Sequence, residues 1–191
     1  LKRIQTEVGI TFVHVTHDQE EAMTMADTVA VMNAGVIEQM GAPRELYEHP
    51  HTTFVANFLG QSNLVRGAVT AVDADHVRVE VAGSVLHCPR DRSLGDQGEV
   101  WVGVRPEKVF LAAEGSETGD GSNLLRGGVV TDVSFIGVST QYLVKMGWGQ
   151  ELMVFEQNSG ARESFRSGDR VDLHWMPSHT YLLDADQDAT A

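Results

Sequence analysis

The chain has 191 residues, of which 42% are apolar, and a formal net charge of −13. This length and composition suit one domain or two small ones with a buried core, and they exclude wholesale disorder. Acidic residues outnumber basic ones both before and after residue 61, which disfavours a nucleic-acid partner because a phosphate backbone is bound by clustered Lys and Arg. No apolar run approaches the roughly 20 residues of a membrane span, so we expect a cytosolic protein without membrane insertion.

The first elements in chain order predict an α/β arrangement. Residues 1–8 have the apolar spacing of an amphipathic helix, and Gly9 is its stop signal. Residues 10–15 (ITFVHV) are almost continuously apolar, which predicts a strand buried on both faces, as in a parallel sheet covered by helices. Asp18 and Glu21 then form a D-x-x-E capping box at the start of a short helix.

A hairpin and two helices are expected next. Residues 28–32 and 36–40 are rich in β-branched and apolar side chains and flank an Asn-Ala-Gly turn. Pro43 opens a helix that ends before His49-Pro50, because Pro suits the first helical turn and disfavours helix in the residue before it. A last helix is expected over residues 53–59. This α/β part is too short to form a doubly wound domain by itself.

An internal repeat dominates the rest of the chain. SNLVRG at residues 62–67 returns as SNLLRG at residues 122–127, in a region with many Val, Thr and Gly and no helical periodicity. We therefore expect two small β-barrel units packed together, each closing on itself and so leaving no exposed edge. The expected domains are 1–61 and 62–188, the second containing repeat one (62–112) and repeat two (122–183).

The two histidines near the amino terminus have different expected roles. His14 lies inside the apolar run, so a packed core histidine is the favoured interpretation. His17 follows the expected strand and directly precedes a capped helix, at the edge where open α/β sheets bind ligands. An imidazole at that place can donate a hydrogen bond to a phosphate oxygen. Position alone leaves a solvent-facing loop histidine equally open.

Other residue types with possible chemistry have simpler interpretations. A helix end explains His49 and His51 better than a metal site, since no Cys or carboxylate cluster lies at ligand spacing. Cys88, the single cysteine, is typical of a reducing compartment, and we expect a small strand residue rather than a nucleophile. The acidic composition favours core packing over base stacking for the tryptophans that recur with the repeat, Trp101 and Trp175, and leaves Trp148 unassigned.

A longer string of residues resembles a known family. GITFVHVTHDQEEAMTM at residues 9–25, with matching words as far as FVANFLG at 54–60, resembles the switch-histidine region of ABC-transporter ATPases. The wording is most similar to the spermidine/putrescine importers, with sugar and ferric-iron importers as alternatives. VGVRPE at residues 102–107 and the repeat resemble the TOBE domain of such proteins. The implied fold is an α/β remnant of an ABC ATPase domain followed by an all-β, OB-like TOBE domain of two small barrels.

The resemblance implies roles for several residues. His17 would be the switch histidine, which contacts the γ-phosphate of ATP and helps to hold the attacking water, with ATP and Mg²⁺ as cofactors of the full-length parent. Arg105 and Glu107 would be structural. Glu20 and Glu21 could be proposed as catalytic acids, but their place in the first turn of a helix favours capping.

The motifs that complete an ATP site are missing from this sequence. It contains no G-x-x-x-x-G-K-[ST] loop, no LSGGQ-like signature and no apolar strand ending in Asp-Glu, and none of its lysines follows a glycine-rich loop. We therefore expect the chain to be the carboxyl-terminal portion of an importer ATPase, which by itself neither hydrolyses ATP nor needs a cofactor.

The implied partners are transmembrane permease subunits and a second ATPase subunit, at the cytoplasmic face of the membrane. We also expect a homodimer, because an incomplete sheet would leave apolar surface to be covered. The alternative is a stand-alone TOBE-type module that binds a small oxyanion.

Overall fold

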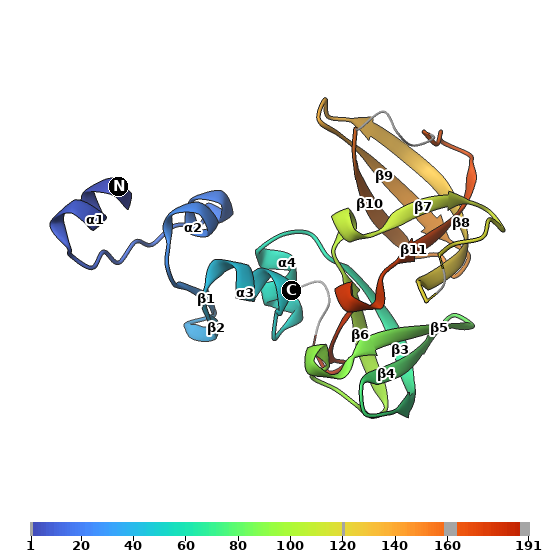
Figure 1. Ribbon diagram of the computed structural model, residues 1–191, viewed down its shortest axis with the longest axis horizontal. Coiled ribbons are helices and arrows are strands. Elements are labelled where there is room, and N and C mark those ends of the chain that lie inside the picture. Colours follow the sequence, from blue (N-terminus) through green and yellow to red (C-terminus); the bar gives the residue numbers. More distant parts are fainter. Residues whose placement is uncertain (1, 120, 159–163, 188–191) are drawn as a thin grey trace. The chain divides into compact units, whose positions relative to one another are not determined.

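The computed structural model describes residues 2–119, 121–158 and 164–187. The chain contacts divide it into two compact units, one reaching Gln61 and the other running from Ser62 to Gln187. In these described ranges, α-helices lie in the first unit only, and the second unit contains strands and short 3-10 turns (Figure 1). Within the described residues, the helices are too short or too polar to cross a bilayer.

The described part of the first unit contains four short helices and one hairpin. The helices are α1 (Lys2–Val8), α2 (Gln19–Met25), α3 (Pro43–Glu48) and α4 (Thr53–Phe58), and the antiparallel strands are β1 (Val29–Asn33) and β2 (Val36–Gly41). The hairpin turns at Ala34 and Gly35, which have φ values of 47° and 83°. Two successive positive φ angles match the right-handed twist of the strands, so the predicted hairpin is confirmed.

The core of this unit joins the hairpin to its last two helices. Val29, Val31, Leu46, Val55 and Leu59 are buried together. The buried side chain of Gln39 fastens the loop after α3: its Nε2 donates to the carbonyl of His49 (2.9 Å), and its Oε1 accepts from the backbone N–H of His51 (2.9 Å). The His-Pro-His stretch therefore lies at a helix end, as expected.

Residues 10–15 differ from the expectation of a buried strand. They form neither helix nor strand, and the exposed fractions of Val13 and Val15 are 91% and 92%. The prediction of a buried strand is wrong for the described structure because a strand needs neighbours to satisfy its backbone groups and cover its faces. Among the described residues, β1 and β2 pair only with each other.

The second unit consists of two five-stranded antiparallel sheets. Their orders are β12-β6-β3-β4-β5 and β10-β9-β8-β11-β7 (Figure 1). The strands are β3 (Asn63–Val72), β4 (His76–Val81), β5 (Ser84–Pro89), β6 (Glu99–Val104), β7 (Phe110–Ala113), β8 (Asn123–Phe135), β9 (Ser139–Met146), β10 (Glu151–Gln157), β11 (Arg170–Trp175) and β12 (Tyr181–Asp184). The two copies of the SNL-x-RG repeat begin β3 and β8, so the repeat marks equivalent strands of the two sheets.

The two repeats exchange their last strands. β7 ends repeat one but pairs with β11 of repeat two, and β12 ends repeat two but pairs with β6 of repeat one. The expectation that each barrel closes on itself is therefore wrong. The cause lies in the turns before these strands: 3-10 helices at Pro106–Lys108 and Pro177–His179 replace a tight hairpin and carry the chain to the other sheet. The exchanged strands and one apolar core that spans both sheets make the two repeats a single unit.

Candidate functional site

Thr16 and Asp18 flank His17 at the start of α2, and both are fixed by hydrogen bonds. Asp18 is the N-cap, and its Oδ1 accepts from the backbone N–H of Glu21 (3.0 Å). The predicted cap is confirmed in this half only. Instead of donating to the Glu21 carboxylate, the backbone N–H of Asp18 donates to Thr16 Oγ1 (2.9 Å), and Thr16 Oγ1 donates to Glu21 Oε2 (2.9 Å). The Thr16 hydroxyl thus bridges the Asp18 N–H and the Glu21 carboxylate, which a capping box would join directly.

The His17 side chain is exposed, and within the described residues no hydrogen bond or ion pair engages it. A neutral imidazole offers one donor and one acceptor, and both are available to a ligand here. The structure places His17 where the sequence puts it, directly before α2. Its role as a phosphate contact stays a prediction.

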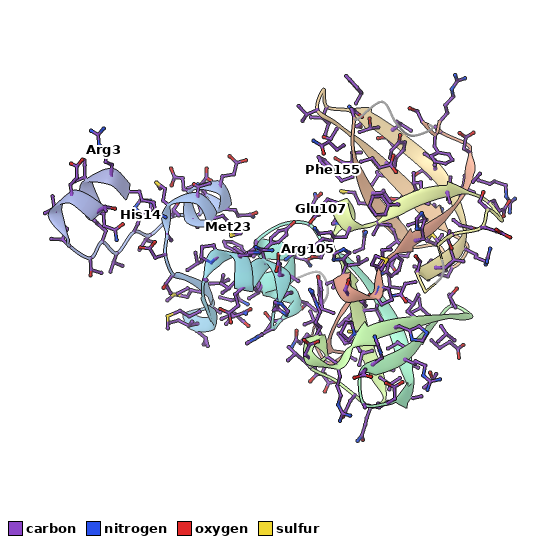
Figure 2. The ribbon with its side chains drawn as sticks, viewed as in Figure 1. Arg3, His14, Met23, Arg105, Glu107 and Phe155 are labelled. Atoms are coloured by element: carbon purple, nitrogen blue, oxygen red, sulfur yellow. The ribbon has the colours of Figure 1, made fainter. Side chains whose placement is uncertain are left out.

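His14 is not a core residue. Its side chain is 54% exposed, and its Nε2 lies 3.4 Å from Glu21 Oε2. The expectation of a packed histidine fails for the same reason as the buried strand, since no neighbouring strand covers this segment. Figure 2 shows His14 on the connection between α1 and α2. An exposed pair of this kind contributes little to stability.

Glu20 and Glu21 lie in the first turn of α2, which has the expected acidic start. The Glu21 carboxylate is occupied by Thr16. The contacts of Glu21 are therefore those of a residue that organises the helix start.

Two asparagines of the repeat hold the two sheets of the second unit together. Asn63 Nδ2 donates to the carbonyl of Met153 (2.7 Å), and its Oδ1 accepts from the Met153 N–H (2.8 Å). Asn123 makes the same pair of bonds with His87 (2.8 and 2.7 Å) and also donates to Thr180 Oγ1 (2.9 Å). Each asparagine belongs to one repeat and binds the backbone of the other. The recurrence of Ser-Asn was the only signal of this role in the sequence.

Arg66, the arginine of the first repeat, fastens the segment that follows β12. Its guanidinium lies 4.7 Å from the centroid of the Trp101 ring, and its Nη2 donates to the carbonyl of Ala185 (3.3 Å). The Trp101 indole N–H donates to the carbonyl of Gln187 (2.8 Å). Trp101 therefore binds the end of the domain and does not lie open for a nucleobase.

Arg126, the arginine of the second repeat, pairs with a buried acid, whereas the acid that pairs with Arg66 is the exposed Glu99 (3.0 Å). Its Nη1 donates to Asp172 Oδ2 (3.3 Å), and the fully buried Asp172 also accepts from the backbone N–H groups of Gly115 and Gly127 (both 3.0 Å). Gly115 follows the exchanged strand β7. In both repeats the arginine and its partner thus hold the segment that follows an exchanged strand.

Trp175 and Arg105 are packing residues, as expected. Trp175 is 2% exposed, and its indole N–H donates to Thr180 Oγ1 (2.9 Å), while Trp148 is 37% exposed. Arg105 is 4% exposed and donates to Ser62 Oγ (2.6 Å). Arg105 and Glu107 flank Pro106 at the 3-10 helix that carries the chain from β6 to β7 (Figure 2).

Cys88 is expected to react slowly with thiol reagents. It is buried in β5, its Sγ lies 3.4 Å from the carbonyl of Thr180, and burial raises its pKa from 9.0 to about 12. The thiolate is the reactive form, so labelling with dithionitrobenzoate at pH 8 should be at least about tenfold slower than in urea. Between pH 9 and 12 the thiol of the unfolded state loses its proton, whereas the buried thiol of the native state keeps it. The free energy of unfolding therefore falls as pH rises through this range. Cys88→Ala should remove that part of the alkaline loss, and native labelling as fast as in urea would contradict the prediction.

Comparison with known proteins gives three findings. The model of the TOBE domain matches residues 102–183. Spermidine/putrescine import ATP-binding proteins of Thermobifida fusca, Acidothermus cellulolyticus and Pseudomonas aeruginosa are 44%, 43% and 39% identical to the chain, over 96%, 96% and 97% of its length. The chain spans about half of each relative: 47%, 48% and 51%.

The third finding concerns the fold. A solved structure of the cytoplasmic molybdate-binding protein ModG superposes with a TM-score of 0.53 over 63% of this chain and 94% of that protein, at 20% identity. At this identity the likeness shows a shared fold and nothing about the ligand. The TOBE match and the proteins that are similar over 96–97% of the chain agree with the resemblance that the sequence motifs indicated. Over nearly its whole length the chain is therefore similar to about half of the spermidine/putrescine import ATP-binding proteins, and residues 102–183 match the TOBE domain.

Proposed function

We propose that this chain supplies the switch histidine and the TOBE domain of an ATP-hydrolysing importer subunit, with polyamines as the transported substrates. The observation that carries the proposal is the similarity, over 96% of the chain, to spermidine/putrescine import ATP-binding proteins. The exposed His17, directly before a capped helix, supports it.

In this function His17 acts on the terminal phosphate. Phosphoryl transfer is catalysed by positioned donors and charges rather than by covalent chemistry of the protein. An imidazole with unengaged ring nitrogens can donate to a γ-phosphate oxygen and orient the attacking water. Magnesium would neutralise phosphate charge, and the glycine-rich GK[ST] loop that cradles the phosphates in such ATPases does not occur among these 191 residues.

The proposed partners are permease subunits and a second ATPase subunit, at the cytoplasmic face of the membrane. The first unit exposes several large apolar side chains, among them Val13, Val15, Met32 and Met40, with exposed fractions between 60% and 92%. We propose that association of two copies covers part of this surface.

A chimera tests the ATPase function. This chain would replace the matching stretch of the Thermobifida fusca relative, so that the relative supplies the rest of the ATP site. We expect the chimera to hydrolyse ATP and His17→Ala to lower turnover by about a hundredfold, the usual effect of removing one transition-state donor. His51→Ala, at another exposed histidine of the same unit, is the control and should keep the activity. Equal turnover of His17→Ala and the parent chimera would refute the proposed role.

The same chimera tests the substrate. In a bacterium that lacks its own polyamine importer, with the permease and binding protein of the relative supplied, we expect it to restore uptake of labelled spermidine. Uptake that stays at the level of the empty strain, although the chimera hydrolyses ATP, would argue against a polyamine importer.

A further inference from the structure

We propose that Thr16 and Glu21 are positioning residues for His17, and this inference rests on the proposed function. Their hydrogen bond holds the backbone on both sides of the histidine in one arrangement. In this way the imidazole is placed before the ligand arrives.

Three hydrogen bonds connect the residues on either side of His17 to each other and to the first turn of α2. The N–H of Asp18 donates to Thr16 Oγ1 (2.9 Å) and closes a turn across the histidine. Thr16 Oγ1 then donates to Glu21 Oε2 (2.9 Å) and ties that turn to the first turn of α2. The Glu21 N–H donates to Asp18 Oδ1 (3.0 Å) and completes the ring. The His17 backbone is spanned by the first of these bonds, and the exposed His17 side chain takes no part in the contacts that the structure describes.

Side chains before α2 alternate between two environments. His14 and Thr16 both approach the same oxygen, Glu21 Oε2, at 3.4 and 2.9 Å. Val13 and Val15, which alternate with them, are 91% and 92% exposed. The side chains of His14 and Thr16 therefore contact the Glu21 carboxylate at the start of α2. The side chain of His17, like those of Val13 and Val15, is exposed.

This arrangement restricts the segment without using the imidazole. A hydroxyl that accepts one bond and donates another can be matched by Ser but not by Val, although Val has the shape of Thr. Fixing a catalytic group in advance accelerates the chemical step, because the ordering cost is met before the reaction. Loss of these hydrogen bonds should therefore lower turnover more than nucleotide affinity.

The test compares Thr16→Val with Thr16→Ser in the chimera. Thr16→Val is expected to lower kcat by about threefold to tenfold, as for the loss of a single hydrogen bond, with the KM for ATP changed less than about twofold. Thr16→Ser should restore kcat. Thr24→Val is the matched control, because the Thr24 hydroxyl donates to backbone carbonyls of the same helix, those of Glu20 (2.6 Å) and Glu21 (3.5 Å), and to none of the atoms that form the ring.

A second measurement uses this chain itself. Hydrogen exchange of the Asp18 amide should be at least about tenfold faster in Thr16→Val than in Thr16→Ser, because only the latter keeps the acceptor. Glu21→Ala should lower kcat in the same way as Thr16→Val. If His17→Ala abolishes turnover while Thr16→Val and Glu21→Ala match the parent, or if Asp18 exchange is unchanged in Thr16→Val, the positioning role is overturned and the proposed function stands. If His17→Ala is fully active, the proposed function itself fails.

Discussion

Gly103→Ala should destabilise the second unit by about 3 kcal/mol, at the upper end of the cost of overpacking a core. Gly103 in β6 pairs directly with Tyr181 of the exchanged strand β12. A Cβ at this position would lie 2.1 Å from Tyr181 Cε2 and 2.3 Å from its Cζ. Tyr181 is 2% exposed, so its ring is surrounded by other groups of the protein. Either the ring or the exchanged strand must shift.

Urea unfolding followed by tryptophan fluorescence measures this loss. Gly147→Ala is the matched control, because its Cβ would meet only the carbonyl oxygen of Gly127, at 3.8 Å, an ordinary contact. We expect Gly147→Ala to change the free energy of unfolding by less than about 0.5 kcal/mol. Equal stabilities of the two variants would show that β12 is not packed against β6 as the structure has it.

Asn123→Ala should cost a similar amount, about 3 kcal/mol, through lost hydrogen bonds rather than through a clash. The side chain is 1% exposed and satisfies the N–H and the carbonyl of His87 as well as Thr180 Oγ1. Alanine leaves these groups, of which Thr180 is fully buried, without the asparagine partner, and each unsatisfied buried group costs about 1–3 kcal/mol. Asn63→Ala, which loses two such bonds, should be less severe.

Asn158 is the control for burial in this series. It is exposed, and its side chain also makes two bonds, accepting from Thr140 Oγ1 (2.7 Å) and donating to the carbonyl of Gly137 (2.7 Å). Water can replace these bonds, so Asn158→Ala should lose less than about 1 kcal/mol. Urea unfolding should rank the losses Asn123, Asn63, Asn158 from largest to smallest. A loss for Asn158→Ala as large as that for Asn123→Ala would contradict the assignment of the buried clamps.

Local patterns predicted the elements that depend on neighbours in the chain. The hairpin of β1 and β2 follows from an Ala-Gly turn with two positive φ values, and α3 follows from Pro43 and the His49-Pro50 stop. The same is true of the helix start before which His17 lies, since Asp18 caps a backbone group only three residues away. The direct bond from the Asp18 N–H to the Glu21 carboxylate, which a capping box predicts, is replaced by two bonds through the Thr16 hydroxyl. The position of Thr16 depends on how the chain approaches the helix, which the capping pattern does not specify.

Apolar character alone could not predict the surroundings of residues 10–15. A strand is stable only when other strands accept its hydrogen bonds and other elements cover its faces. The composition of this run shows that it suits such a place, but the described residues provide no such partner. For this reason the expected strand and the expected core position of His14 failed together.

The sequence by itself determined the short helices, the hairpin, the repeat and, through its motifs, the resemblance to importer ATPases. Only the tertiary structure decided that β7 and β12 change places, that Asn63 and Asn123 clamp the opposite sheets, and that Arg66 and Arg126 meet different partners. The reason is physical: turn and capping signals act over a few residues, whereas these contacts join residues such as Asn63 and Met153, whose separation in the chain is 90. The packing of one shared core decides which distant strands pair. The alternation of side chains along a single strand shows which face is buried but does not name the partner strand.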